Sequence, residues 1–156
     1  MKKIFVTMLL AFMATTINAQ VTMNVRVGVG GVSTVYDADN GDAVSFAFQT
    51  NIPFTKGSSY TISPSFWLLM ADDTSNMGIL FPLQVGKKVF ISNRTFFYPK
   101  VGATLGYQNE GFNIGPSLAL AIETGHFVVS LDAYLSLSNY DNYLPYAASL
   151  TLGYKF

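Results

Sequence analysis

Hydrophobic residues alternate with small or polar residues along most of this chain, and the alternation is clearest in its last segment, residues 144–156. A period of two predicts a β-strand with one apolar face and one small or polar face. The strand ends in two aromatic residues on its apolar face, Tyr154 and Phe156. Such aromatics are typical of the interfacial belt of a transmembrane β-barrel, and the alternative is the last strand of a soluble sandwich.

The same period of two recurs along the rest of the chain after residue 20. It predicts seven earlier strands, at 21–35, 44–52, 60–70, 78–90, 97–107, 112–122 and 127–137. Turn residues separate them, and Asn40-Gly41 is the strongest hairpin signal. An even number of strands of this length predicts an all-β fold, an antiparallel eight-stranded transmembrane up-and-down β-barrel. Prolines interrupt four of these strands and are expected near strand ends or bulges, at Pro64, Pro82, Pro99 and Pro116.

The composition of the second face distinguishes a membrane barrel from a soluble one. A soluble ligand carrier turns its apolar face inward and presents a charged face to water. Here the second face consists of Gly, Ala, Ser and Thr with few charges. Such side chains suit the interior of a narrow eight-stranded barrel. We therefore expect the apolar face to contact lipid.

The first residues have the features of an export signal. Lys2 and Lys3 precede an apolar run at 4–13 that is too short to span a bilayer as a helix, and Ala19 provides a small residue before a cleavage point. The expected division is a signal peptide at 1–19 and an outer-membrane β-barrel at 20–156, with an uncleaved anchor as the alternative. The expected location is the bacterial outer membrane.

Charge is sparse and is separated by barrel end. Charged residues are 12% of the chain, the formal net charge is zero and Cys is absent, which argues against nucleic acid as a partner and excludes disulfides. The odd-numbered connections carry only acidic charges: Asp37, Asp39, Asp42, Asp72, Asp73, Glu110 and Asp141. The other end carries Lys56, Lys87, Lys88, Arg94 and Lys155. We expect the acidic end to face outward.

A few charged and amide side chains fall on the predicted inner face. Counted along their strands, Arg26, Lys100 and Asp132 lie at similar heights. Gln49 and Gln84 lie near that height, and Glu123 and Lys155 lie closer to the rim. Because an unpaired buried charge is costly, the sequence predicts a lumen polar network that blocks passage. The alternative is that each charge is hydrated separately in a leaky lumen. Trp67 and Tyr134 are predicted to fill the lumen.

The alternating strands, the export signal and the terminal Phe156 together resemble the small bacterial outer-membrane barrels. The chain is similar to the membrane domain of outer membrane protein A, to OmpX-like barrels and particularly to the PorT-like barrel family of Bacteroidetes. Segments 99–107 and 115–120 carry the last resemblance. The resemblance implies outer-membrane lipid and lipopolysaccharide as surroundings. It also implies that Tyr154 and Phe156 form the assembly signal read by the barrel assembly machinery.

No constellation for catalysis, a cofactor or a metal is predicted. Lipid-modifying enzymes on eight-stranded barrels need a His with Ser or another activating group, but the first serine after the single His126 is Ser130, four residues on, and no His-x-Ser pair exists. Asp37, Asp39 and Asp42 fit a solvated acidic loop better than a divalent-ion site. The expected role is structural or surface-interactive, with a plugged lumen and a possible protein partner at the outer loops. The alternative is a narrow, porin-like passive channel for ions or small solutes.

Overall fold

The computed structural model describes residues 21–32, 41–71, 78–108, 111–137 and 146–156. Their strands are β1 (Thr22–Val32), β2 (Gly41–Pro53), β3 (Tyr60–Ala71), β4 (Gly78–Lys87), β5 (Val89–Ser92), β6 (Thr95–Gln108), β7 (Gly111–Thr124), β8 (Phe127–Leu135) and β9 (Tyr146–Lys155). Within these ranges no helix is long and apolar enough to cross a membrane. The predicted signal peptide, Asn40 and most of the predicted acidic loops lie outside the described residues.

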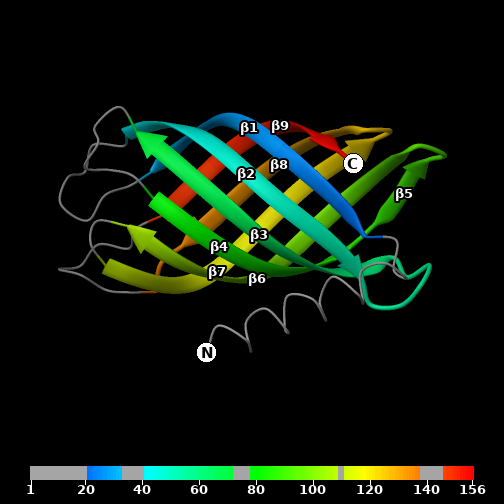
Figure 1. Ribbon diagram of the computed structural model, residues 1–156, viewed down its shortest axis with the longest axis horizontal. Coiled ribbons are helices and arrows are strands. Elements are labelled where there is room, and N and C mark those ends of the chain that lie inside the picture. Colours follow the sequence, from blue (N-terminus) through cyan, green and yellow to red (C-terminus); the bar gives the residue numbers. More distant parts are fainter. Residues whose placement is uncertain (1–20, 33–40, 72–77, 109–110, 138–145) are drawn as a thin grey trace, which may run out of the picture.

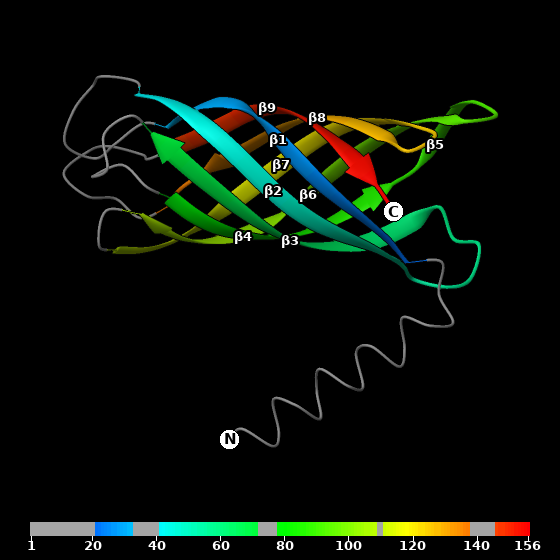
Figure 2. The same cartoon turned by 45° about the horizontal axis from the view of Figure 1, so that its top comes forward.

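The strands form one closed antiparallel barrel. Consecutive strands pair with each other except β4 and β5, β1 pairs with β9, and both β4 and β5 pair with β6. Figures 1 and 2 show the strands tilted across the long axis of the barrel. The short β5 continues the register of β4 against β6, since Gly86 faces Lys100 and Val89 then faces Phe97. Thus β4 and β5 together make one barrel strand, and the predicted closed eight-stranded fold is confirmed.

The expectation that the prolines lie near strand ends or bulges was wrong. Pro64 and Pro82 lie in mid-strand with the register kept on either side. The β2–β3 ladder passes from the Gln49–Ser65 pair to the Ile52–Ile62 pair, which skips the position of Pro64. A proline has no N–H to donate, so each one removes ladder contacts on one side while the other side stays paired.

Pro99 explains why the predicted fourth strand, 78–90, is divided. The β4–β6 ladder ends at Lys100 and the β5–β6 ladder begins at Phe97. The two β6 residues between them, which include Pro99, lie opposite Lys87 and Lys88. Pro116 has the corresponding position beside β8, because the β7–β8 ladder begins at the next residue, Ser117. The prolines therefore interrupt single ladders without opening the barrel.

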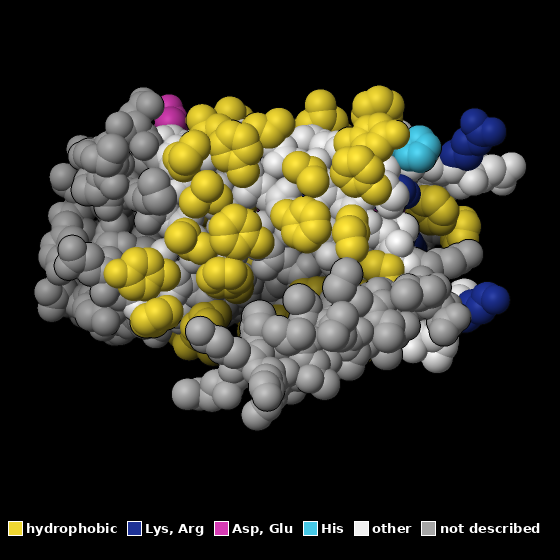
Figure 3. Space-filling view, in the orientation of Figure 1, with side chains coloured by type: hydrophobic (Ala, Val, Ile, Leu, Met, Phe, Trp, Pro, Cys, Tyr) yellow, Lys and Arg dark blue, Asp and Glu magenta, His cyan; other side chains and the backbone are white. Residues whose placement is uncertain are grey.

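Side chains alternate between the lumen and the outer surface as the sequence predicts. In β8 every second residue from Val128 onward is buried, and the residues between them are wholly or partly exposed. The outer surface is apolar, with Val29, Leu83 and Leu118 among its exposed side chains. Figure 3 shows hydrophobic side chains along the barrel wall and Lys and Arg side chains near one end. The barrel thus has a polar interior and an apolar exterior, the reverse of a soluble barrel.

We name the two ends of the barrel by their residues. At the lysine end lie Lys88, Lys155 and the turns that join β2 to β3, β5 to β6 and β7 to β8. At the loop end, β1 finishes at Val32 and β2 begins at Gly41. Two turns at the lysine end use glycine with positive φ, Gly57 at 81° and Gly125 at 56°, a conformation that favours residues without a Cβ.

Candidate functional site

The barrel interior is the candidate site, and its part nearest the loop end is apolar. Trp67 and Leu69 of β3 pack with Leu80 of β4 and Tyr134 of β8, and three alanines complete the cluster. The Trp67 indole Nε1 donates to Ser45 Oγ at 2.5 Å, and Ser45 donates to Ser149 Oγ at 3.2 Å. This cluster places large side chains from β3, β4 and β8 together in the lumen.

Toward the lysine end, Arg26 forms an ion pair with Asp132. The Nη1 atom lies 2.6 Å from Asp132 Oδ2 and also donates to Thr151 Oγ1 at 3.2 Å. The Arg26 and Asp132 side chains are only 2% and 10% exposed. The arginine on β1 reaches across β9 to β8. Gly153 of β9 leaves room for the Arg26 side chain, because a Cβ at Gly153 would lie 2.4 Å from Arg26 Cγ. The structure therefore brings two of the predicted site residues together.

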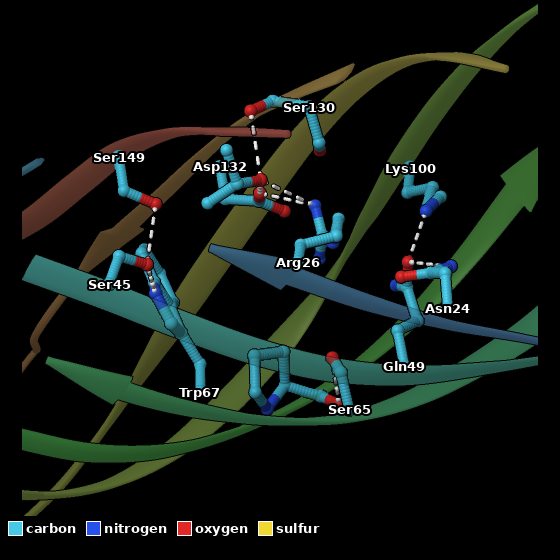
Figure 4. A network of polar contacts seen from close by, with 12 residues as sticks. Asn24, Arg26, Ser45, Gln49, Ser65, Trp67, Lys100, Ser130, Asp132 and Ser149 are labelled. Carbon is cyan, nitrogen blue, oxygen red and sulfur yellow. Dashed lines mark hydrogen bonds and ion pairs between the residues drawn. The ribbon is translucent and has the colours of Figure 1, made fainter. Parts of the chain in front are cut away.

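Lys100 does not contact that pair and lies in a second polar group. Its Nζ donates to Gln49 Oε1 at 2.6 Å, from β6 across the lumen to β2. Asn24 Nδ2 donates to the same Gln49 oxygen at 3.5 Å. Gln84 is separate again, with Nε2 donating to Ser117 Oγ at 3.3 Å. Figure 4 shows the Arg26 and Lys100 groups as distinct sets of contacts rather than one network.

A third charged group lies at the lysine end around Glu123. The carboxylate oxygen Oε2 is 3.2 Å from Lys155 Nζ and 3.4 Å from Lys88 Nζ, and the Glu123 side chain is fully buried. Lys155 was expected near Glu123 at the rim. The charge pattern of the sequence places Lys88 only at the basic end, although its phase, four residues after inward Gln84, also predicts that its side chain faces the lumen.

A hydroxyl-rich group near the lysine end was not predicted. Tyr98 is fully buried with Val128 and Ala121, and its hydroxyl lies 3.2 Å from Ser63 Oγ. Ser63 in turn donates to Asn51 Oδ1 at 2.8 Å. The alternation in the sequence predicts that all these side chains face inward, but it does not predict which of them contact each other. Two apolar clusters and several separate polar groups therefore lie in the lumen.

The two residues of the predicted assembly signal lie on the outer surface at the lysine end. The Tyr154 ring contacts Phe156 edge-on at 5.1 Å between centroids and stacks on His126 at 5.3 Å. Phe127 approaches the same tyrosine at 6.3 Å. These four rings form an aromatic cluster on the barrel wall. Its role in assembly stays a prediction.

The described residues give no catalytic or metal-binding geometry. None of their His, Cys, Asp and Glu side chains form a group of three that could hold a metal ion. His126 is exposed in the β7–β8 turn with Nδ1 3.1 Å from the Lys155 carbonyl oxygen, whereas Ser130 is buried in the lumen. Asp42 is exposed at the loop end, and Asp37 and Asp39 lie outside the described residues.

Comparison with known proteins identifies the fold. No family model and no curated protein matches the sequence. Among solved structures, Ail, the attachment invasion locus protein of Yersinia pestis, is 13% identical, with a TM-score of 0.54 over 89% of this chain and 99% of Ail. Neisserial surface protein A is 8% identical, with a TM-score of 0.63 over 86% and 95%. A de novo designed transmembrane β-barrel is 16% identical, with a TM-score of 0.52 over the same shares.

Proposed function

We propose that this protein is a small bacterial outer-membrane barrel, with a structural or surface-interaction role. The observation that carries the proposal is the continuous apolar outer surface. Exposing such a surface to water is unfavourable, whereas lipid acyl chains would cover it. Aromatic side chains lie at both ends of that surface, including Tyr154 and Phe156 at the lysine end and Tyr107 and Phe112 at the loop end. Solved structures with similar folds include Ail, described as an outer membrane protein.

The lumen supports a plugged barrel rather than a conduit. Polar contacts join opposite walls at Lys100–Gln49, and the Arg26–Asp132 pair spans β9. Trp67 and Leu80 pack in the lumen beyond them toward the loop end. Each contact would have to break, and buried charges lose their partners, before a continuous water path formed. We therefore place function on the surface: lipid and lipopolysaccharide around the wall, and a protein partner at the loop end.

The partners of assembly follow from the same proposal. A signal peptide at 1–19 would deliver the chain to the periplasm, and the barrel assembly machinery would read Tyr154 and Phe156. The PorT-like resemblance also stays a prediction. Among the described residues, His126 lies on the exposed β7–β8 turn, where its ring nitrogen contacts the Lys155 carbonyl oxygen, so we propose no enzymatic activity.

Cysteine labelling of whole bacterial cells tests both location and orientation. The chain has no native Cys, so single substitutions report one position each. We expect a membrane-impermeant maleimide to label Asp42→Cys at the loop end on intact cells. Asn93→Cys, in the turn between β5 and β6, should react only after the outer membrane is permeabilised. Labelling of neither variant on intact cells, or of Asn93→Cys alone, would contradict the proposal.

A further inference from the structure

A pocket of about 330 Å³ opens at the lysine end, beyond the polar contacts of the lumen. Its lining includes Asn51, Ser59, Thr61, Lys88, Phe90 and Phe96. The volume is at the lower end for small-molecule sites, so a ligand here would be small. Apolar walls with a few convergent polar groups are the usual composition of such sites.

Lys88 provides a positive charge at this pocket that its neighbours do not fully neutralise. Its Nζ lies 3.4 Å from Glu123 Oε2, but Lys155 approaches the same oxygen at 3.2 Å. Two ammonium groups therefore share one carboxylate. The Lys88 side chain is 20% exposed, and its backbone N–H donates to the Ser59 carbonyl at 2.8 Å, which fixes the residue against the β2–β3 turn.

The aromatic wall lies beside the same lysine. Phe90 and Phe96 have ring centroids 4.7 Å apart, and the Lys88 ammonium lies 5.9 Å from the Phe96 ring. Phe90 is 71% exposed, so apolar ring surface is available at the pocket. A positive charge next to exposed rings is complementary to a molecule with an anionic head and an apolar body.

We propose that this pocket binds a small amphipathic anion, with its carboxylate or phosphate beside Lys88 and its apolar part against Phe90 and Phe96. The anion would complete the charge balance that Glu123 leaves incomplete. Such a molecule could come from the membrane as a fatty acid or from the aqueous phase as a soluble acid. The site depends on residues of the barrel alone and stands apart from any role of the loop end.

Nuclear magnetic resonance of the isotope-labelled mature protein in phosphatidylcholine nanodiscs tests the site. The probes are phenylbutanoate added to the buffer, its uncharged analogue phenylbutanol, and hexadecanoate incorporated into the disc. We expect saturable shifts of the Ser59 and Lys88 amides with phenylbutanoate. The alcohol should bind about tenfold more weakly, because it lacks the charge-assisted hydrogen bond. The same shifts with hexadecanoate would identify the membrane as a source, and their restriction to phenylbutanoate would identify the aqueous phase.

Adjacent lysines provide a matched pair of variants. Lys88→Met removes the proposed ligand contact, whereas Lys87→Met removes an exposed lysine whose ammonium lies 5.1 Å from the outer Tyr60 ring. Phenylbutanoate should bind about tenfold more weakly to Lys88→Met and unchanged to Lys87→Met. Equal binding of acid and alcohol to the unchanged protein would overturn the proposal, even if Lys88→Met does not fold. Absence of saturable shifts with both acids, or equal loss in both variants, would also overturn it.

Discussion

At the scale of single residues, the barrel interior is defined by which charges meet. Asp132 is paired with Arg26 at 2.6 Å, in contact with Thr151 as well. Breaking a buried ion pair by removing one partner leaves an uncompensated charge, which costs more than the pair itself contributes. The pair itself therefore adds little stability, but substituting only one of its two residues is expected to be strongly destabilising.

Asp132→Ala should lower the free energy of unfolding by about 3–5 kcal/mol, since Arg26 would remain buried without its carboxylate. Urea unfolding of the refolded barrel in lipid vesicles measures the change. Asp42→Ala, which removes an exposed carboxylate, should change stability by less than about 0.5 kcal/mol. The double variant Arg26→Met with Asp132→Leu should be more stable than Asp132→Ala. A double variant that is as unstable as Asp132→Ala, or less stable, would contradict the conclusion that the unpaired Arg26 charge causes the loss.

The identity of the inward residues could be predicted from the sequence, but the division of their side chains into separate groups could not. Alternation assigned Arg26, Lys100 and Asp132 to the inner face. Their relative heights were counted along separate strands, and strand tilt and stagger shift equal counts to different heights around the barrel. Lys100 therefore meets Gln49, while Arg26 reaches Asp132 over Gly153.

At the scale of strands, the phase of each element is the feature that separates a membrane barrel from a soluble one. A shift by one residue would exchange the two faces of a strand. In β3, Trp67 is 3% exposed and faces the lumen, whereas Phe66 beside it is 38% exposed on the outer wall. The periodicity predicted this phase correctly because the outer face is uniformly apolar.

Tryptophan fluorescence in brominated lipid tests the phase of β3. Trp67 is the single tryptophan of the chain, so its emission reports one position. Brominated phosphatidylcholine should leave Trp67 emission nearly unquenched, because the ring is shielded from acyl chains. The exchanged variant Phe66→Trp with Trp67→Phe should be strongly quenched in the same vesicles. Quenching of the native protein to the level of the exchanged variant would show that β3 has the opposite phase.

The strand boundaries were less predictable than the phase. A period of two continues through Lys88, so the sequence alone gives one strand where the structure has β4 and β5. The interruption depends on Pro99 of the neighbouring strand, which is distant in sequence from Lys88. Pairing partners of this kind become visible only once the register is known.

At the scale of the whole molecule, two surfaces with opposite chemistry are separated by a single layer of backbone. The outer wall is apolar, and the inner wall holds polar groups between apolar clusters. Small inward residues such as Ala119, Ala121 and Ser117 leave room for the few large ones that cross the lumen. The barrel fold followed from the sequence, whereas a surface role for a plugged barrel rests on how those side chains fill the interior.

Conductance of the refolded mature protein in a planar bilayer tests that role most directly. A gel comparing boiled with unboiled samples first establishes that the barrel is folded. Because polar contacts and apolar clusters lie in the lumen and we propose that they plug it, we expect the folded protein to insert without steady openings above the bare bilayer. Steady ohmic openings would contradict the plugged barrel and favour a narrow passive channel lined by Arg26, Lys100 and Asp132.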